Sequence, residues 1–294
     1  MTTTTMRDRS GGLVMHAAAR HYDRLAWLLT LGRERALRER MADLAGLAPG
    51  ESVLDVGCGT GALALVARQR VGPSGAVHGV DASPEMIAQA IRKATTARLR
   101  ASFQVARAQA LPFPTARFDV VLCTLMLHHL PRAVRDECAR EIRRVLRPGG
   151  RVLAVDFEPP PAPRRGGLLS RLHRHGHVPL HEIVELLGRA ELRVEERGSV
   201  GLLDLRFAVA RAPGAADDDV PPSPDEYRTL APLPAPRWLV PAALAALAAG
   251  HVLMLRVASS ALVVPALVLV AGIVALALAH GPAAVGTHRA RRRR

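Results

Sequence analysis

Aromatic side chains are scarce in this chain of 294 residues, where Phe, Trp and Tyr together make up 3% of the sequence. The formal net charge is +14, but the excess is mostly dispersed arginine, and no basic stretch is interleaved with stacking side chains. Single-stranded nucleic acids bind to surfaces that combine positive charge with aromatic rings. The composition therefore argues against nucleic acid as a partner.

Cysteine is also scarce. The three cysteines, Cys58, Cys123 and Cys138, fall in apolar patterns without a C-x-x-C pair, which argues against zinc and disulfides and predicts small core residues. Residues 173–177 place histidine at every second position, a pattern that resembles a metal site. A solvated substrate lid rich in Gly and Arg has the same pattern. We favour the lid and expect no metal.

The N-terminus lacks an apolar signal core, so nothing predicts secretion, and the front of the protein is expected to stay cytosolic. Residues 1–48 are predicted to form a helical lid segment. The pattern is helical from 17 to 47, with Leu37, Met41 and Leu44 on one face. Helices in this position usually cover a ligand cleft.

A short apolar strand, Val53 to Val56, runs into three glycines at alternate positions, Gly57, Gly59 and Gly61. Glycines let the backbone turn tightly and approach a ligand with no Cβ in the way. The helix that follows offers unpaired N–H groups at its N-terminus. The feature predicts a nucleotide-cofactor loop, with a bare tight turn as the alternative.

A second predicted strand, Val77 to Asp81, ends in a carboxylate about 20 residues after this loop, where an acid can accept both ribose hydroxyls. The dinucleotide motif G-x-G-x-x-G does not fit, because position 62 is Ala and the third glycine is Gly61. The D-x-G-x-G-x-G segment that begins at Asp55 resembles instead the first motif of the class I S-adenosylmethionine-dependent methyltransferases.

Five further segments follow in the order and spacing of that family. They are Asp81–Met86, Ala110–Phe113, Phe118–Leu122, Leu127–Leu130 and Leu146–Gly150. The whole set, over about residues 15 to 211, is similar to the ubiquinone and menaquinone C-methyltransferase branch and its small-molecule relatives. The resemblance implies S-adenosyl-L-methionine as the cofactor and methyl transfer as the reaction.

The alternation of predicted strands and helices indicates an α/β fold. We expect a Rossmann-like parallel sheet with helices on both faces and ligands at the carboxyl ends of the strands. The resemblance adds an antiparallel last strand. Residues 49–211 are expected to form this methyltransferase domain. It should contain helices at 84–95 (capped by Ser83), 132–147 and 179–190, and late strands at 192–196 and 203–210.

The loops that follow the strands should line one pocket. Backbone amides of the glycine loop can approach the methionine carboxylate of the cofactor, and Asp81 can hold the ribose. The resemblance places Tyr22 near the cofactor's amino-acid end, although half-buried packing on an amphipathic helix is an equal alternative. The expected cofactor-binding residues are Tyr22, Asp55, Gly57, Cys58, Gly59, Gly61, Asp81, Ala82, Met86, Ala108, Gln109 and Leu125.

Methyl transfer from a sulfonium requires a nucleophile in line with the methyl–sulfur bond, so orientation and desolvation supply most of the rate. A general base helps only where the acceptor carries a proton. His128 and His129 follow the fourth predicted strand and are the candidate catalytic residues, because histidine titrates near neutral pH. One of the two is expected to pack or cap locally.

One departure from the family lies before the Leu-Pro-Phe segment. Relatives commonly read Gly-Asp-Ala there, whereas this chain reads Ala106-Arg107-Ala108. The usual acid accepts the adenine amino group, and an arginine has no acceptor to offer. Adenine contact should then rest on backbone near Ala108, at some expense of cofactor affinity.

Residues 212–237 are rich in proline and acidic residues and predict a linker. Beyond it, residues 238–255 and 261–279 contain no Asp, Glu, Lys or Arg, and each run is about long enough to span a bilayer. We expect a two-helix transmembrane hairpin over 238–280. The alternative is a buried helical hairpin packed on the enzyme.

Basic residues predict the orientation of this hairpin. Five arginines lie in the tail, residues 281–294, and only Arg256 lies in the short connection between the spans. By the positive-inside rule, both ends of the hairpin should be cytoplasmic. We therefore expect a multi-pass protein of the cell membrane with a cytoplasmic catalytic domain and C-terminus. The tail can bind anionic membrane lipid.

Three functions are compatible with these features. The favoured one is a membrane-tethered methyltransferase of a small lipophilic acceptor, such as a quinol or another prenylated or acyl molecule. The second is a methyltransferase of a soluble metabolite whose anchor serves only localisation. The third is a non-catalytic cofactor-binding or scaffold protein, which Arg107 favours and which the intact Asp55, Gly57, Gly59 and Asp81 disfavour.

Overall fold

The computed structural model describes residues 5–7, 13–15, 19–159, 177–214, 227–236 and 238. The chain divides into two units, one formed by 1–30 and 34–231 and the other by 31–33 and 232–294. The expected hairpin lies outside the described residues except for Trp238, and so do the expected tail and two of the three histidines at 173–177. None of the described helices is long and apolar enough to cross a membrane.

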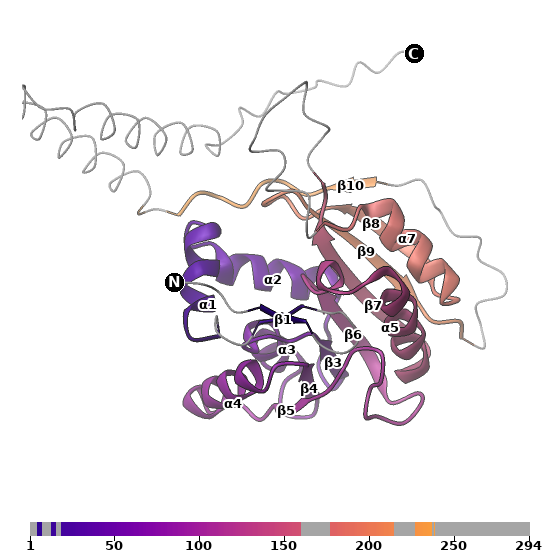
Figure 1. The fold of residues 1–294 in the computed structure, drawn as a ribbon, viewed down its shortest axis with the longest axis horizontal. Coiled ribbons are helices and arrows are strands. Elements are labelled where there is room, and N and C mark those ends of the chain that lie inside the picture. Colours follow the sequence, from indigo (N-terminus) through magenta and orange to yellow (C-terminus); the bar gives the residue numbers. More distant parts are fainter. Residues whose placement is uncertain are drawn as a thin grey trace, which may run out of the picture. The chain divides into compact units, whose positions relative to one another are not determined.

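The first unit is built on an eight-stranded sheet with the strand order β10-β8-β9-β7-β6-β3-β4-β5 (Figure 1). Its strands are β3 (Ser52–Val56), β4 (Ala76–Asp81), β5 (Ser102–Val105), β6 (Phe118–Thr124), β7 (Leu146–Phe157), β8 (Arg193–Ser199), β9 (Leu205–Arg211) and β10 (Tyr227–Thr229). Strands β5, β4, β3, β6 and β7 are parallel, and β9 is antiparallel to both β7 and β8. The predicted Rossmann-like sheet with an antiparallel last strand is confirmed. Two short strands, β1 (Thr5–Arg7) and β2 (Leu13–Met15), pair separately.

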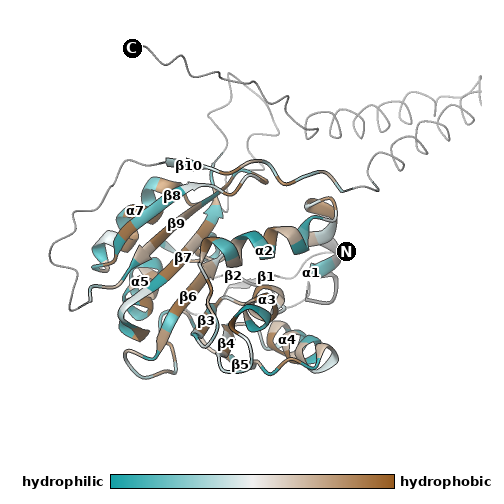
Figure 2. Cartoon of the chain, turned by 180° about the vertical axis from the view of Figure 1, so that it is seen from behind, coloured by the Kyte–Doolittle hydropathy of each residue, from teal (hydrophilic) through white to brown (hydrophobic). Residues whose placement is uncertain are grey.

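Helices cover both faces of the sheet. They are α1 (Ala19–Leu29), α2 (Glu34–Leu44), α3 (Ala62–Val71), α4 (Pro84–Ala97), α5 (Arg132–Val145) and α7 (Leu180–Arg189), with a short 3₁₀ helix η1 (Leu127–His129). In Figure 1, α1 to α4 lie on one side, and α5 and α7 lie on the other. Inward-facing side chains of the central strands pack with α5 and α7 in one core that includes Leu54, Val121 and Ile183. Figure 2 shows the resulting pattern, with hydrophobic strands and helices that carry both hydrophobic and hydrophilic faces.

Three element boundaries differ from the sequence prediction, each for a local reason. The helical pattern from 17 to 47 is interrupted, because Leu31 and Gly32 have φ of 51° and 76°, in the left-handed region that ends a helix. The helix expected over 132–147 ends at Val145, because Leu146 already pairs with Phe118 of β6. Strand β9 begins at Leu205 rather than 203, because Leu203 and Asp204 have positive φ.

Two predicted helix starts are confirmed. The Ser83 side chain accepts a hydrogen bond from the Met86 N–H at 3.2 Å, and Pro84 occupies the first turn of α4. Helix α7 covers the range that the apolar pattern indicated, with Ile183 and Leu187 buried.

One half-buried arginine holds the end of α2 against the sheet. The Arg151 side chain, on β7, donates to the Ala45 and Gly46 carbonyls at 2.6 Å each and to the Glu51 carboxylate at 2.8 Å. Its side chain is 16% exposed, so these charge-assisted bonds are largely shielded from water. The contact fixes α2 with respect to the first strand of the sheet, and α2 supplies a side chain to the site described below.

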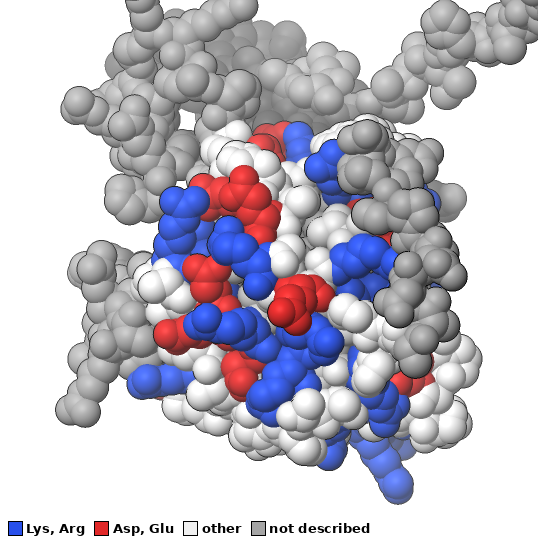
Figure 3. Space-filling view, turned by 90° about the vertical axis from the view of Figure 1, so that its right-hand side faces the viewer, with Lys and Arg blue, Asp and Glu red and all other residues white. Residues whose placement is uncertain are grey.

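Charged residues on α5 and α7 are mixed in sign. Figure 3 shows the face at the right-hand side of Figure 1, where Lys and Arg atoms alternate with Asp and Glu atoms at short range. Arg189 pairs with Asp136 at 2.8 Å, and Arg135 lies 3.5 Å from Glu182. Much of the positive charge on these helices is therefore balanced locally.

Candidate cofactor and acceptor site

The glycine loop turns sharply at the carboxyl end of β3. Gly57, Gly59 and Gly61 all have positive φ, at 71°, 53° and 78°. A Cβ on Gly57 would lie 2.3 Å from Met126 Cγ, and one on Gly61 would lie 2.9 Å from Ala90 Cβ. A Cβ on Gly59 would meet nothing within 4 Å. Two of the glycines are therefore required for packing, and the third faces open space.

Asp81, at the end of β4, is tied to this loop. Its carboxylate accepts hydrogen bonds from the backbone N–H of Gly59 and of Ser83, each at 2.9 Å. Burial raises the pKa of Asp81, and the two backbone donors oppose that rise. An ionised carboxylate has about four lone-pair sites, so two of them remain for hydroxyl donors.

A cavity of about 40 Å³ lies beside the loop. Its walls are Tyr22, Arg38, Asp55, Gly57, Cys58, Gly59, Thr60, Ala62, Leu63, Thr124 and Leu125. The structure thus brings six of the predicted cofactor residues to one cavity: Tyr22, Asp55, Gly57, Cys58, Gly59 and Leu125. The other predicted site residues are absent from its lining; they are Gly61, Asp81, Ala82, Met86, Ala108, Gln109, His128 and His129. This volume is too small for a whole nucleoside cofactor.

Asp55 is a strongly perturbed acid in this cavity. It is 1% exposed, and within the described part of the chain its Oδ2 atom has no hydrogen-bond partner. Burial raises the pKa of Asp55 to about 7, and nearby Asp81 adds to the rise, whereas Arg38 and the Ala64 N–H oppose it. A buried carboxylate that lines a cavity and has an unpaired oxygen indicates a place for a cationic or hydrogen-donating ligand group.

Arg38 is a second cavity residue, which the sequence analysis missed. It lies on α2, is 8% exposed, and its Nε is 3.6 Å from Glu34 Oε1 without a hydrogen bond. The signal in the sequence was an arginine within the apolar stripe of α2, beside Leu37 and three residues before Met41. Its guanidinium gives the cavity a positive charge next to Asp55.

Helix α1 is attached to the glycine loop by a small polar network. The Asp23 Oδ1 atom accepts hydrogen bonds from the Thr60 hydroxyl and from the Lys93 ammonium group, both at 2.8 Å. Thr60 belongs to the loop and Lys93 to α4, so the network joins three elements. It holds the neighbouring Tyr22 at the cavity wall.

Leu125 stands in a strained backbone conformation at the same wall. Its φ is 57°, a region that L-residues with bulky side chains rarely adopt, and its N–H donates to the Val155 carbonyl at 2.8 Å. Strain of this kind persists where the surroundings enforce it, which is common at ligand sites.

His128 follows three residues later, in η1, and is held by an aspartate that the sequence analysis did not select. The Asp156 carboxylate, at the end of β7, accepts from His128 Nδ1 at 2.7 Å and from the His128 N–H at 3.1 Å. Asp156 is fully buried. With the carboxylate oxygen as the acceptor, Nδ1 is the donor, and this contact leaves Nε2 unused. The sequence signal was an acid among the apolar residues at the end of a strand.

His129 has a different environment. Its ring centroid lies 4.0 Å from that of His128. Burial lowers the pKa of His129 to about 4, and the neighbouring His128 lowers it further, while Asp156 opposes the shift. At neutral pH His129 is therefore uncharged. This fits the expectation that one of the two histidines packs locally, and a catalytic role for either stays a prediction.

The loop after β5 places Arg107 at the surface. Its side chain is exposed, and the adjacent Ala106 N–H donates to the Asp81 carbonyl at 3.0 Å. Further along, the loop is held by α5, where Glu141 accepts from the Leu111 N–H at 2.7 Å and Arg144 donates to the Phe113 carbonyl at 2.7 Å. The start of this loop is thereby held beside the end of β4, and adenine contact through the backbone near Ala108 stays a prediction.

Metal binding finds no support in the described ranges, which contain no group of three His, Cys, Asp or Glu side chains able to hold an ion. His177 is the one described member of the alternating histidines, and its ring lies 6.2 Å from that of Phe157. His173 and His175 lie outside the described residues. The expected absence of metal stays a prediction for that segment.

Comparison with known proteins agrees with this geometry. Residues 53–150 match the family described as a methyltransferase domain. Over 143 residues the chain is 40% identical to the demethylmenaquinone methyltransferase of Thermus thermophilus, covering 49% of this chain and 64% of that protein. It is 32% identical over 157 residues to the ubiquinone/menaquinone biosynthesis C-methyltransferase of Laribacter hongkongensis, covering 53% and 64%. The match thus spans less than two thirds of each relative.

A solved structure shows the same fold. The S-adenosylmethionine-dependent methyltransferase from Aquifex aeolicus superposes with a TM-score of 0.53 at 21% identity, over 66% of this chain and 97% of that chain. At this identity the likeness concerns the fold alone. Together with the matched family, it shows that the chain carries a class I S-adenosylmethionine-dependent methyltransferase domain. Within that class, it is similar to the quinone C-methyltransferases, as the motifs indicated.

Two glycine variants should separate the packing role of the loop from its ligand role. Gly59→Ala has room for its Cβ, so its free energy of unfolding should fall by only about 1–2 kcal/mol, the strain of an alanine at positive φ. It should nevertheless bind S-adenosylmethionine about tenfold or more weakly. Gly57→Ala should lose more stability, because its Cβ collides with Met126. Urea unfolding and calorimetric titration check both. Wild-type cofactor affinity in Gly59→Ala would contradict the assignment.

Asp55→Asn should change the pH dependence of stability. Because burial raises the pKa of Asp55 from its usual value of about 4 to about 7, the folded state holds this proton more tightly than the unfolded state. The stability that this group contributes is complete below pH about 4 and is lost as the pH rises through about 7. Without added cofactor, the free energy of unfolding of Asp55→Asn should rise relative to that of wild type over that interval. The difference should reach up to about 4 kcal/mol at pH 8.

Urea unfolding at pH 5 and pH 8 measures this difference. Asp136→Asn is the control, because its carboxylate is 38% exposed and pairs with Arg189 at the surface. If Asp55→Asn is more stable than wild type by the same amount at both pH values, the titration of the Asp55 carboxylate is not the cause of the difference.

Proposed function

We propose that this protein transfers a methyl group from S-adenosyl-L-methionine to a small lipophilic acceptor, such as a quinol or another prenylated or acyl molecule. The observation that carries the proposal is the buried Asp55 carboxylate, which lines the cavity beside the glycine loop and has one oxygen without a hydrogen-bond partner among the described residues. The similar proteins from Thermus thermophilus and Laribacter hongkongensis are named for demethylmenaquinone and for ubiquinone and menaquinone, which supports the acceptor class.

The residues present fit this cofactor. The open space at Gly59 permits a close approach to the loop backbone, and Asp81 retains acceptor capacity for the ribose hydroxyls. Asp55 can accept from the ammonium group of the methionine end, and the Arg38 guanidinium can pair with its carboxylate. When bound, the sulfonium supplies an activated methyl group. The protein then has to orient the acceptor in line with it and to exclude water.

On the acceptor side, His128 is the candidate base. Asp156 fixes its ring orientation and leaves Nε2 as the acceptor of a proton from a phenolic or activated carbon centre. Because His129 is neutral and half-buried, it can shape the wall of the site without adding charge there.

The apolar runs at 238–255 and 261–279 support a further part of the proposal, in which a hairpin over 238–280 tethers the enzyme to the cell membrane. The arginines of the tail and the cytosolic origin of the cofactor support a cytoplasmic catalytic domain. The tethered enzyme would then encounter an acceptor dissolved in the bilayer by diffusion in the plane of the membrane. A soluble metabolite as the acceptor, with the anchor serving only localisation, is the alternative that the experiments below distinguish.

The test of the proposed activity uses the purified full chain, S-adenosylmethionine and a reduced demethylquinone. Wild type should bind the cofactor and methylate the quinol, and Asp81→Ala should lose binding. His128→Ala should lower kcat by about 10²–10⁴ with cofactor affinity unchanged. Asp156→Asn should also lower kcat, because the wrong tautomer becomes available. His181→Ala, an exposed histidine on α7, is the matched control and should behave as wild type.

Failure of wild type to bind the cofactor would favour the non-catalytic reading. Binding without methylation of the quinol would overturn the acceptor class, and a soluble product in a metabolite extract would then favour the alternative. Full activity in His128→Ala would contradict the role of His128 as the general base.

Deletion of residues 238–294 tests the tether. The full chain should co-sediment with anionic vesicles and methylate a long-chain quinol held in them, whereas the shortened protein should stay in the supernatant and lose most of that activity. A water-soluble short-chain quinol should be methylated equally by both, which controls for folding. Equal turnover on the vesicle-bound acceptor would contradict the role of the hairpin.

A further inference from the structure

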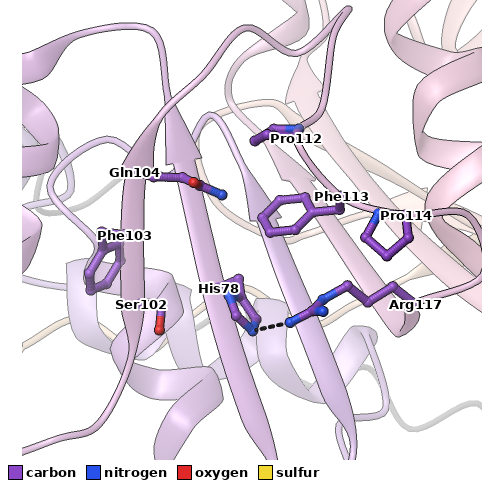
Figure 4. Close-up of a pocket in the computed structure, with 8 residues that line it drawn as sticks. All are labelled: His78, Ser102, Phe103, Gln104, Pro112, Phe113, Pro114 and Arg117. Carbon is purple, nitrogen blue, oxygen red and sulfur yellow. Dashed lines mark hydrogen bonds between the residues drawn. The ribbon is translucent and has the colours of Figure 1, made fainter.

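A second and larger cavity, of about 380 Å³, lies away from the cofactor loop. It is formed between β4, β5 and the loop that leads into β6 (Figure 4). Its lining residues are His78, Ser102, Phe103, Gln104, Pro112, Phe113, Pro114 and Arg117. The volume is within the range of small-molecule sites.

This cavity is distinct from the cofactor site. His78 pairs in register with Ser102, the first residue of β5, whereas Asp81 pairs with Val105 at the other end of the same strand. Asp81 lies three positions after His78 on the strand, which is roughly 10 Å at about 3.3 Å per residue. The cavity therefore lies toward the amino ends of the strands, and the cofactor loops lie at their carboxyl ends.

Arg117 is the principal polar group of this cavity. In Figure 4 its side chain extends toward His78, and its Nη2 atom lies 3.2 Å from His78 Nε2. Its guanidinium carbon stands 5.7 Å from the ring centroid of Phe113 and 5.5 Å from that of Phe118, distances typical of cation–π contacts. Within the described residues, its Nε has no hydrogen-bond partner and no carboxylate pairs with it.

The positive charge of Arg117 is not balanced by its neighbours. Burial lowers the pKa of His78, and Arg117 lowers it further, so the imidazole is neutral at physiological pH. Nε2 then accepts from Arg117, and Nδ1 carries the ring proton. The remaining walls are two prolines, the Phe113 ring, the Ser102 hydroxyl and the Gln104 amide. The cavity thus holds one net positive charge beside an aromatic face, with neutral polar groups at its rim.

We propose that this cavity binds a small organic anion that carries a flat ring, of the aryl carboxylate class. The planar guanidinium of Arg117 matches a carboxylate in shape and charge, and it is already oriented by two rings and by His78. A flat ring packs against Phe113 and between Pro112 and Pro114. Ser102 and Gln104 are placed to bond polar substituents on that ring.

The site also adjoins the cofactor side through one loop. Phe113 and Pro114 belong to the same segment as Ala108, and α5 holds that segment at Leu111 and Phe113.

The test titrates the full chain with benzoate, with its neutral isostere benzamide and with inorganic phosphate, followed by calorimetry or ligand-observed NMR. Benzoate should bind at least tenfold more tightly than either of the others. Arg117→Gln should weaken benzoate binding tenfold or more, and Arg117→Lys should weaken it less, because one charge-assisted bond is kept. Arg100→Gln is the control, an arginine two residues before Ser102 and outside the cavity lining.

Arg117→Gln also removes the cation–π contacts, so a second variant guards against loss of folding. Gln104→Trp changes an exposed position at the cavity mouth and should block benzoate while leaving S-adenosylmethionine binding intact. Absence of benzoate binding at 10 mM (about −3 kcal/mol) would overturn the proposal. So would wild-type affinity in both Arg117→Gln and Gln104→Trp, or equal affinity for benzoate and benzamide. Phosphate that binds as tightly as benzoate would overturn the ring requirement.

Discussion

A carboxylate buried at the carboxyl end of the central strand is the constraint around which the cofactor side of the site is arranged. Asp55 is almost fully shielded from water, and its charged form is costly there unless a partner is supplied. Arg38 moderates the cost from α2, and α2 is itself held by the Arg151 clamp to the Ala45 and Gly46 carbonyls. The cavity at the carboxyl end of β3 therefore depends on the hydrogen bonds of Arg151, which lie near the amino end of that strand. A site that keeps such a group sacrifices stability for ligand binding.

The two halves of the site come from different strands and meet only at the sheet edge. The glycine loop and Asp81 follow β3 and β4, whereas His128 and Asp156 follow β6 and β7. Leu125 connects them, since it lines the cavity in a strained conformation and precedes η1 by two residues. The strain, the buried carboxylates and the Gly57–Met126 packing make this edge less tolerant of substitution than the rest of the sheet.

The loop between β5 and β6 links the carboxyl and amino ends of the sheet. Its first part runs beside Asp81, its middle is fixed to α5 by Glu141 and Arg144, and its last part carries Arg117 into the second cavity. The loop has no helix of its own, so the face of β4 and β5 beneath it is left open enough for a cavity. The exposed side chain of Arg107 belongs to the same loop, and Arg107 is absent from the lining of the cofactor cavity.

Local patterns in the chain were sufficient for the class of fold, the strand and glycine turn that begin the site, the Ser83 cap and six residues of the cavity. Alternating apolar strands, glycines that need positive φ and a carboxylate at a strand end are short-range features, so the sequence determines them by itself. Only the tertiary structure decided that Arg38 reaches Asp55, that Asp156 holds His128 and that Arg117 meets His78 across 39 residues. These pairs lie far apart in the sequence, and their contacts depend on how strands and helices pack, which no local pattern contains.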